Sequence, residues 1–405
     1  MRSPETIRRL LPWIGAALSG LLLAAAFPPL EWAGTAWVAL VPLMLAVQGT
    51  HSRRTLGLGF VSGAVFWLPS ISWLRHVSAP GAVGLALYCA LYMMPFALLF
   101  AVWCRRFGVE RWWVNLGLVV VASAAWAALE YVRAIFATGF GWNPLGSSQY
   151  QNIHLIQIAR WGGVYSVSAL VAAVNAAAAL TLLQYMDREK RWKRLHPELI
   201  LVVLALAAAV LDGKKCLREP APPSQPLRVA LIQPNIPQPD FFTPEKFPAI
   251  RELLKRLSND AMVGSKPDLL IWSETADPEE LRGSPDAYDL VYQLVTNGVP
   301  LLTRSIDTEW TDDGPLYYNC TFLVDASGKI AQGYDKRHLV PFGEYVPLRR
   351  IFPFLKAVTP IQDSFTPGST STVFKLDQPP VAFSVLICFE DTVACLSRES
   401  VQNGA

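Results

Sequence analysis

Long apolar runs in the first half of the chain constrain the fold more than any other feature. A helix needs about 20 apolar residues to cross the hydrocarbon core of a bilayer. Seven runs approach or reach this length: Leu10–Phe27, Trp32–Val47, Thr55–Leu74, Ala82–Cys104, Trp112–Leu129, Trp161–Met186 and Leu199–Leu211. The whole chain is 52% hydrophobic and 17% charged, which is too apolar for an ordinary soluble protein of 405 residues. Residues 1–213 are therefore predicted to form a transmembrane helical domain of about seven spans.

The first and the seventh apolar runs each have a second interpretation. The first run follows Arg8 and Arg9 and ends near Ala24–Ala26, a pattern also found in cleaved signal peptides. The further runs favour an uncleaved anchor. The seventh run has only 13 uncharged residues, a length more typical of a buried helix, although basic side chains on both sides could reach the two interfaces.

Positive charge predicts how the helices are oriented. Thirteen basic residues precede the first run or follow the second, fourth and sixth: Arg2, Arg8, Arg9, Arg53, Arg54, Arg105, Arg106, Arg111, Arg188, Lys190, Arg191, Lys193 and Arg194. The opposite loops contain only Arg75, Arg133 and Arg160. Because basic loops stay in the cytoplasm, the N-terminus is predicted to be cytoplasmic. Seven crossings then place the second half outside the cytoplasm, and six would reverse that prediction.

The second half has the pattern of an α/β domain. Residues 214–226 are rich in proline and are predicted to be a stiff linker. Within residues 227–405, apolar strands alternate with amphipathic helices. The predicted strands are Leu227–Gln233, Asp268–Trp272, Val299–Thr303, Tyr317–Val324, Lys329–Tyr334 and Val381–Ile387, and the predicted helices are Thr243–Val263 and Asp286–Asn297.

Three ionisable residues follow strands of this domain. Glu274 lies in I-W-S-E-T, Lys336 in Y-D-K, and Cys388 in V-L-I-C-F-E-D. At the carboxyl ends of strands, a carboxylate, an ammonium and a thiol could perform acyl transfer as base, oxyanion partner and nucleophile. The backbone N–H of Phe389 is a second candidate oxyanion donor. Each residue alone is also compatible with a structural role, as a buried thiol, a helix cap or a solvated lysine.

The sequence around the thiol contains an apparent conflict. Glu390 and Asp391 follow Cys388 directly, and nearby anions raise the pKa of a thiol. We hypothesise that Lys336 supplies the compensating positive charge.

Other features limit the function or leave it open. A net charge of +3 gives no support for a nucleic-acid partner, and the six cysteines have neither metal-site nor disulfide-scaffold spacing. No cofactor is predicted. In the first half, Glu130 and Arg133 lie one helical turn apart, before a loop rich in glycine and aromatic residues. They could form a local ion pair or contact a lipid headgroup.

These segments resemble the nitrilase superfamily, and with the membrane half they resemble its apolipoprotein N-acyltransferase family. The similarity rests on the three motifs above, on N-I-P-Q (Asn235–Gln238), on K-R-H-L-V-P-F-G-E-Y-V-P (Lys336–Pro347) and on W-x-x-x-E…R…T-G-F-x-W…G-x-S-Q (Trp126–Gln149). It implies a membrane α-helical bundle followed by a nitrilase-like αββα sandwich, in the bacterial inner membrane with the catalytic domain on the periplasmic side.

The resemblance also implies a reaction and a set of residues. An acyl chain would pass from a phospholipid, through a thioester, to the N-terminal amine of a diacylglyceryl-cysteine apolipoprotein. By this resemblance Cys388 is the nucleophile, Glu274 the base and Lys336 the oxyanion partner. Glu344 and Glu390 are supporting carboxylates. Contacts with lipid or substrate are expected at Phe242, Glu130, Arg133 and Trp142.

The chain also departs from the family pattern. Phe242 and Phe389 stand where the family often has Trp and Tyr. Arg304 stands where the family has a glycine, and its side chain could crowd the backbone. The chain stops 17 residues after Cys388, where the family continues with further strands, helices and a last span. We therefore expect a fragment whose catalytic domain is incomplete at its C-terminal end.

Two other functions use the same features. A membrane-tethered amidase would use the same three residues to hydrolyse a small amide, with water in place of the amine. A transporter or membrane scaffold with an inactive second domain would not react at Cys388.

Overall fold

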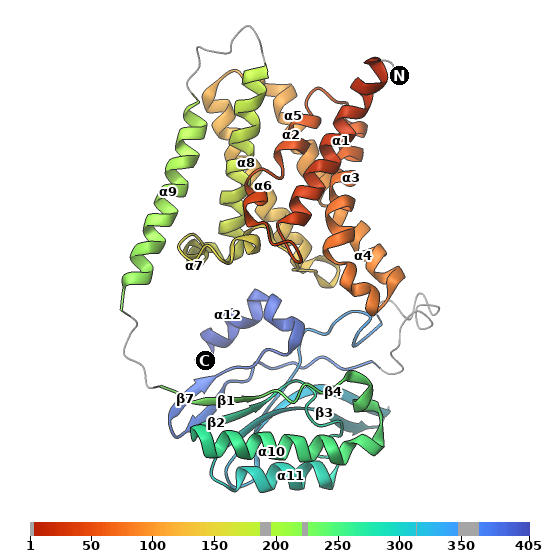
Figure 1. Cartoon of the computed structure of the whole chain (residues 1–405), viewed down its shortest axis with the longest axis vertical. Coiled ribbons are helices and arrows are strands. Elements are labelled where there is room, and N and C mark those ends of the chain that lie inside the picture. Colours follow the sequence, from red (N-terminus) through yellow and green to blue (C-terminus); the bar gives the residue numbers. More distant parts are fainter. Residues whose placement is uncertain (1–3, 187–195, 221–225, 313, 347–363) are drawn as a thin grey trace. The chain divides into compact units, whose positions relative to one another are not determined.

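The computed structural model describes residues 4–186, 196–220, 226–312, 314–346 and 364–405. Contacts divide the chain into two units, Met1–Ala221 and Pro222–Ala405 (Figure 1). The predicted basic cluster at 188–194 and Pro347, the last residue of the K-R-H-L-V-P block, lie outside the described residues.

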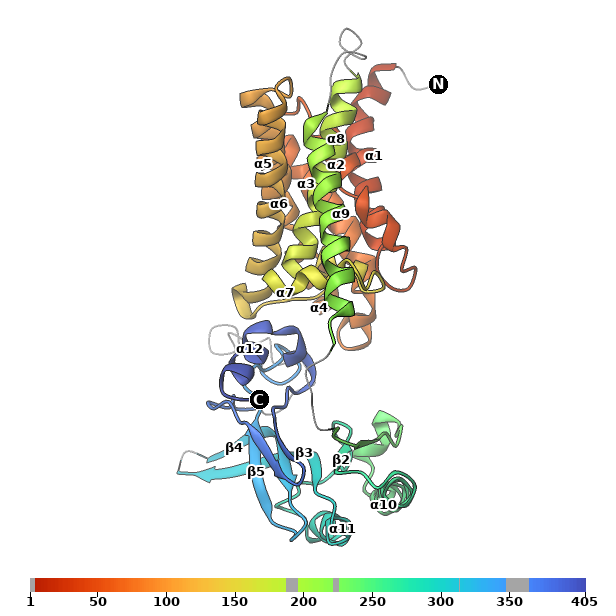
Figure 2. The ribbon, with the colours of Figure 1, turned by 90° about the vertical axis from the view of Figure 1, so that its left-hand side faces the viewer.

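The first unit is a helical bundle that follows the apolar runs. Its α-helices are α1 (Pro4–Ala25), α2 (Val41–Ala46), α3 (Ser52–Ser70), α4 (Ala79–Ala90), α5 (Met93–Phe107), α6 (Trp112–Ile135), α7 (Ala159–Gly162), α8 (Val164–Met186) and α9 (Pro197–Arg218). The longer helices of this unit run side by side (Figure 2). Three stretches of the described chain are long and apolar enough to cross a membrane: Ala79–Phe107, Trp112–Thr138 and Val164–Met186. The chain is a membrane protein, and seven spans stay a prediction.

The predicted span Trp32–Val47 is not one continuous helix. It contains a short 3-10 helix, Ala33–Trp37, then a break, and then α2. Asn175 of α8 supplies hydrogen-bond partners for the backbone at this break. Its side chain accepts from the Leu40 N–H (2.8 Å) and donates to the Ala36 carbonyl (2.9 Å). Apolar surroundings permit an interrupted helix only where freed backbone groups find such partners. The sequence predicted the run as one candidate span, and its apolar composition does not reveal this break.

The last helix of the unit also differs from the prediction. α9 has 22 residues, where the apolar run suggested 13. It continues through residues 214–218, which the sequence assigned to the linker. These residues contain good helix formers, and no proline follows until Pro220.

The second unit contains two sheets. The larger has the order β1-β2-β3-β4-β5, with β1 (Val229–Ile232), β2 (Leu269–Trp272), β3 (Leu301–Thr311), β4 (Gly314–Val324) and β5 (Ile330–Asp335). The β1–β2 and β2–β3 pairs are parallel, and the β3–β4 and β4–β5 pairs are antiparallel. The smaller sheet pairs β6 (Phe374–Asp377) with β7 (Pro380–Phe383). The helices are α10 (Phe247–Ser265), α11 (Pro285–Val295) and α12 (Ala394–Gln402).

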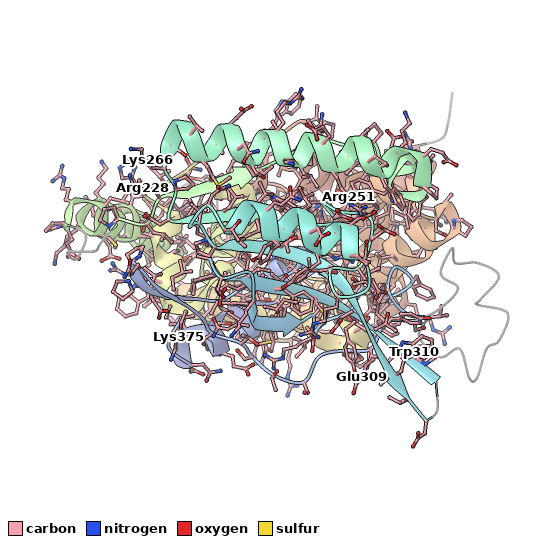
Figure 3. The ribbon with its side chains drawn as sticks, turned by 90° about the horizontal axis from the view of Figure 1, so that it is seen from below. Arg228, Arg251, Lys266, Glu309, Trp310 and Lys375 are labelled. Carbon is pink, nitrogen blue, oxygen red and sulfur yellow. The ribbon has the colours of Figure 1, made fainter. Side chains whose placement is uncertain are left out.

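Both faces of the larger sheet are covered, as the apolar strands require. Leu270 and Trp272 of β2 pack in a core cluster with residues of α10 and α11. Leu269, which points to the opposite face, packs with Phe374 and Leu376 of β6. Figure 3 shows α10 and α11 side by side over the sheet. The helix–sheet–sheet layering confirms the predicted nitrilase-like α/β fold.

Two strands differ from the predicted boundaries. β3 extends through the polar residues 304–311, because it pairs with β4 along its whole length, from Leu301↔Val324 to Thr311↔Gly314. β7 ends at Phe383, and within the described chain residues 384–387 form no ladder. Cys388 therefore follows an extended segment and does not end a strand as predicted.

The Asn175 contacts generate a test of the first unit. Asn175→Leu removes both hydrogen bonds and leaves a backbone donor and acceptor unpaired in the bundle. We expect a loss of about 1–3 kcal/mol in the free energy of unfolding, because buried polar groups without partners cost this much. Thermal unfolding in detergent measures the loss. Gln151→Leu, at an exposed position, is the control, and equal melting of the two variants would contradict the assignment.

Candidate active site

Cys388 lies at a strained turn. It begins a short 3-10 helix, Cys388–Thr392, and its backbone has φ = 54°. A left-handed backbone costs a residue with a β-carbon about 1–2 kcal/mol. The residue is exposed and its sulfur is partly buried, so the thiol can still be reached by a reagent. Strain of this kind persists only where the surrounding structure enforces it.

The Glu390 carboxylate supplies that enforcement. It is fully buried and accepts hydrogen bonds from the backbone N–H groups of Ile387 (2.9 Å), Arg337 (2.8 Å) and His338 (2.9 Å) and from the Tyr334 hydroxyl (2.9 Å). Burial and the carboxylate itself raise the pKa of Tyr334, so its hydroxyl stays protonated and donates. One carboxylate thus joins the turn at Cys388 to the segment after β5.

That segment contains a buried ion pair. Lys336 is 1% exposed, and its Nζ lies 2.9 Å from Glu344 Oε2 and 3.0 Å from Oε1. Glu344 also accepts from Asn319 Nδ2 and from the Val340 N–H, both at 2.8 Å. A buried ammonium needs such a partner, and these bonds fix the position of the pair.

Three of the predicted site residues, Glu274, Lys336 and Glu344, lie within electrostatic range of the Cys388 thiol. Burial raises the pKa of the Cys388 thiol, and the Glu274 carboxylate raises it further. Lys336 and the Phe389 N–H lower this pKa, and Glu344 raises it. The combined effect is upward, so the thiol is protonated at neutral pH. A protonated thiol needs a base in order to attack, and Glu274, an exposed carboxylate just after β2, lies within electrostatic range.

The sequence identified the wrong anions beside the thiol. We expected Glu390 and Asp391 to oppose the thiolate. Glu390 instead binds the four donors described above, and the anions that raise the thiol pKa are Glu274 and Glu344. Lys336 acts in the predicted direction, but it does not reverse the upward shift.

Asn319 and Tyr334 also support the site but were not predicted from the sequence. Asn319 is 1% exposed on β4 and connects Glu344 to Arg304, whose Nε donates to Asn319 Oδ1 at 2.7 Å. A polar amide within an otherwise apolar strand was the available signal. Tyr334 ends the predicted strand Lys329–Tyr334, and nothing in the sequence pointed to its bond with Glu390.

Two aromatic residues of the second unit have different surroundings. Phe389 stacks on His338 with ring centroids 5.9 Å apart. Phe242 ends a 3-10 helix and is 78% exposed, so its ring is free to contact an apolar ligand.

Glu130 and Arg133 are buried in the first unit, where each binds the chain of the following loop. Glu130 accepts from Trp126 Nε1 (2.7 Å) and the Leu145 N–H (2.6 Å). Arg133 donates to the carbonyls of Phe140 and Trp142, the latter at 2.7 Å. Each side chain thus binds other partners rather than forming the predicted ion pair, and contact with a lipid headgroup stays a prediction. Burial places these side chains where they shape the loop.

Trp142 is half-buried on the same loop. Its ring packs 5.5 Å from that of Trp73 and stacks on Phe140. Lipid contact at Trp142 stays a prediction.

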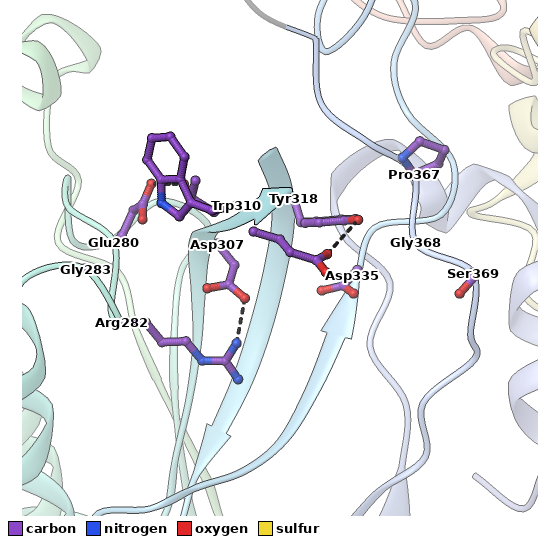
Figure 4. A pocket seen from close by; sticks show the side chains of 12 residues that line it. Glu280, Arg282, Gly283, Asp307, Trp310, Tyr318, Asp335, Pro367, Gly368 and Ser369 are labelled. Carbon is purple, nitrogen blue, oxygen red and sulfur yellow. Dashed lines mark hydrogen bonds and ion pairs between the residues drawn. The ribbon is translucent and has the colours of Figure 1, made fainter. Parts of the chain in front are cut away.

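A cavity in the second unit is a separate feature. It has a volume of about 780 Å³ and lies beside the β3–β4 hairpin (Figure 4). Carboxylates of Glu280, Asp307, Glu309 and Asp335 line it, and Arg282 pairs with Asp307. None of the predicted site residues lines the cavity, and its acidic walls disfavour a phospholipid headgroup.

Comparisons with known proteins match both units. Residues 19–177 match the apolipoprotein N-acyltransferase N-terminal domain, and residues 228–405 match the carbon-nitrogen hydrolase domain. An apolipoprotein N-acyltransferase of Geobacter metallireducens is 33% identical over 404 residues, which cover 97% of this chain and 75% of the relative. The chain belongs to the apolipoprotein N-acyltransferase family. A second member, from Gloeobacter violaceus, is 28% identical over 98% of this chain and 76% of its own length. Family membership makes the chain an acyltransferase.

The charges around the thiol predict opposite effects of two substitutions. Glu274→Gln removes an anion, so the pH of half-maximal Cys388 alkylation should fall by on the order of one unit. Lys336→Met removes a cation, so the midpoint should rise. Iodoacetamide labelling resolved by peptide mass spectrometry measures both, with the exposed thiol of Cys395 on α12 as the internal reference. Shifts in the same direction would exclude the proposed charge arrangement.

Glu390 and its neighbour form a matched pair for a second test. Glu390→Gln presents an amide NH₂ to backbone donors, so we expect acyl transfer to fall at least tenfold and the chain to melt earlier. Asp391→Asn, at the exposed next position, should change neither. Assay of both purified variants decides, and normal activity in the Glu390 variant would show that the strained turn does not need this carboxylate.

Proposed function

We propose that the chain transfers an acyl chain from a phospholipid to the N-terminal amine of a diacylglyceryl-cysteine apolipoprotein, through a thioester on Cys388. The convergence of Cys388, Glu274 and the Lys336–Glu344 pair supports this assignment. Family membership favours transfer to an amine over the amidase that the sequence left open.

In the first step the Cys388 sulfur attacks the ester carbonyl of the phospholipid. Glu274 takes the thiol proton as the carbon–sulfur bond forms. The Lys336 ammonium and the Phe389 N–H stabilise the oxyanion of the tetrahedral intermediate. The carbon–oxygen bond then breaks, Glu274 returns the proton to the leaving alkoxide, and lysophospholipid departs from the thioester.

In the second step the amine of the acceptor attacks the thioester. Glu274 takes a proton from the attacking nitrogen and gives it to the departing sulfur, which restores the thiol. The products are an amide and free Cys388. Because the raised thiol pKa keeps the sulfur protonated between turnovers, both steps depend on the base.

The donor and the charge pattern support a location in the bacterial inner membrane, with several spans and the catalytic domain on the periplasmic side. Three stretches are long and apolar enough to cross. The excess of basic residues in alternate loops favours a cytoplasmic N-terminus.

Substitution of the nucleophile tests the proposal. Purified chain incubated with acyl-labelled phospholipid should acquire label that hydroxylamine releases, as expected of a thioester. Cys388→Ala should abolish this label, and Cys388→Ser should lower it by at least a hundredfold. Cys395→Ser is the matched control and should keep it.

The acceptor decides between transfer and hydrolysis. A lipopeptide with a free amine should receive the label, and its N-acetylated form should not. Label on Cys388→Ala, or release only to water, would overturn the proposed function.

A further inference from the structure

Arg304 connects the two sides of the candidate active site. This β3 residue donates from Nη1 to Thr275 Oγ1 at 2.8 Å and from Nε to Asn319 Oδ1 at 2.7 Å. Asn319 in turn donates to Glu344, which pairs with Lys336. A continuous series of side-chain bonds therefore runs from the residue after Glu274 to the buried ammonium.

The Thr275 end of this series is conformationally demanding. Thr275 has φ = 56°, an outlier for a β-branched residue. Within the described part of the chain, no hydrogen bond fixes the carboxylate of its neighbour Glu274. The direction of Glu274 thus depends on the backbone of this turn, and the bond from Arg304 is the contact that secures the Thr275 side chain.

Arg304 also balances the charge of the cluster. Burial lowers the pKa of its guanidinium, and the carboxylates of Glu274 and Glu344 raise it. Arginine keeps its charge in such surroundings. With Arg304 the cluster has two carboxylates and two cations, whereas without it the Lys336 ammonium would face both carboxylates alone.

We propose that Arg304 is a positioning residue. It bonds the turn at Thr275 to Asn319, and through Asn319 to Glu344 and Lys336, and so keeps the Glu274 carboxylate directed at the thiol as the base. The role in catalysis rests on the proposed acyl transfer, but the effect on the thiol does not. A lysine at 304 would keep the charge and lose the two-pronged contact, and a methionine would lose both.

The experiment follows Cys388 alkylation by iodoacetamide against pH in the full chain. Arg304→Met should raise the midpoint by about one pH unit, because a cation near the sulfur is lost. Arg304→Lys should leave the midpoint within about 0.3 units. Arg282→Met, which removes an arginine paired with Asp307 of the same strand, should not move it.

Acylation of Cys388 by labelled phospholipid supplies the second readout. Arg304→Met and Thr275→Val should slow it at least tenfold, with the acid limb of the rate displaced to higher pH only for Arg304→Met. Loss of label in the unsubstituted chain would refute the proposed function while the alkylation result still stands. An unmoved alkylation midpoint in a folded Arg304→Met chain would overturn the positioning role. So would a defect limited to the KM for phospholipid and absent with diacylglycerol, because Arg304 would then bind the headgroup phosphate.

Discussion

The buried carboxylate of Glu390 is the constraint on which the second unit depends. Four donors from three separate positions of the chain converge on it, and each would be an unpaired polar group without it. An unpaired buried donor costs about 1–3 kcal/mol, so the carboxylate can offset the cost of the left-handed backbone at Cys388. The reactive Cys388 thiol therefore lies on a turn whose backbone is held in place by the buried Glu390 carboxylate.

Different groups around the sulfur keep its proton in place at rest and stabilise negative charge during attack. Burial and Glu274 keep the proton on the thiol, while Lys336 and the Phe389 N–H favour the negative charge that appears during attack. A resting thiolate would react with many electrophiles, whereas a protonated thiol beside a base reacts mainly when a carbonyl is bound in line. The arrangement suits an enzyme that meets its donor and its acceptor in turn.

Much of this could be predicted from the sequence, and the failures have physical causes. The apolar runs predicted the positions of the helices, because a helix that lies in lipid can be recognised from its apolar composition alone. The strand patterns predicted the sheet. The break between Ala33–Trp37 and α2 could not be predicted, since Asn175, distant in the sequence, provides its partners. The early end of β7 and the inward direction of Glu390 likewise depend on contacts between segments. The motifs placed Glu274, Lys336 and Cys388 at strand ends or turns, but not the side chains that orient them.

The two carboxylates of the V-P-F-G-E and C-F-E motifs have complementary tasks. Glu390 binds neutral donors and fixes backbone geometry, whereas Glu344 binds an ammonium and fixes charge. Both carboxylates bind groups of the segment 334–344. Glu390 lies in the turn at Cys388, and Glu344 belongs to the segment itself. Since that segment contains Lys336, any displacement of it changes the position of the oxyanion partner and the support of the nucleophile together. Geometry and charge in this site are therefore coupled through one stretch of chain.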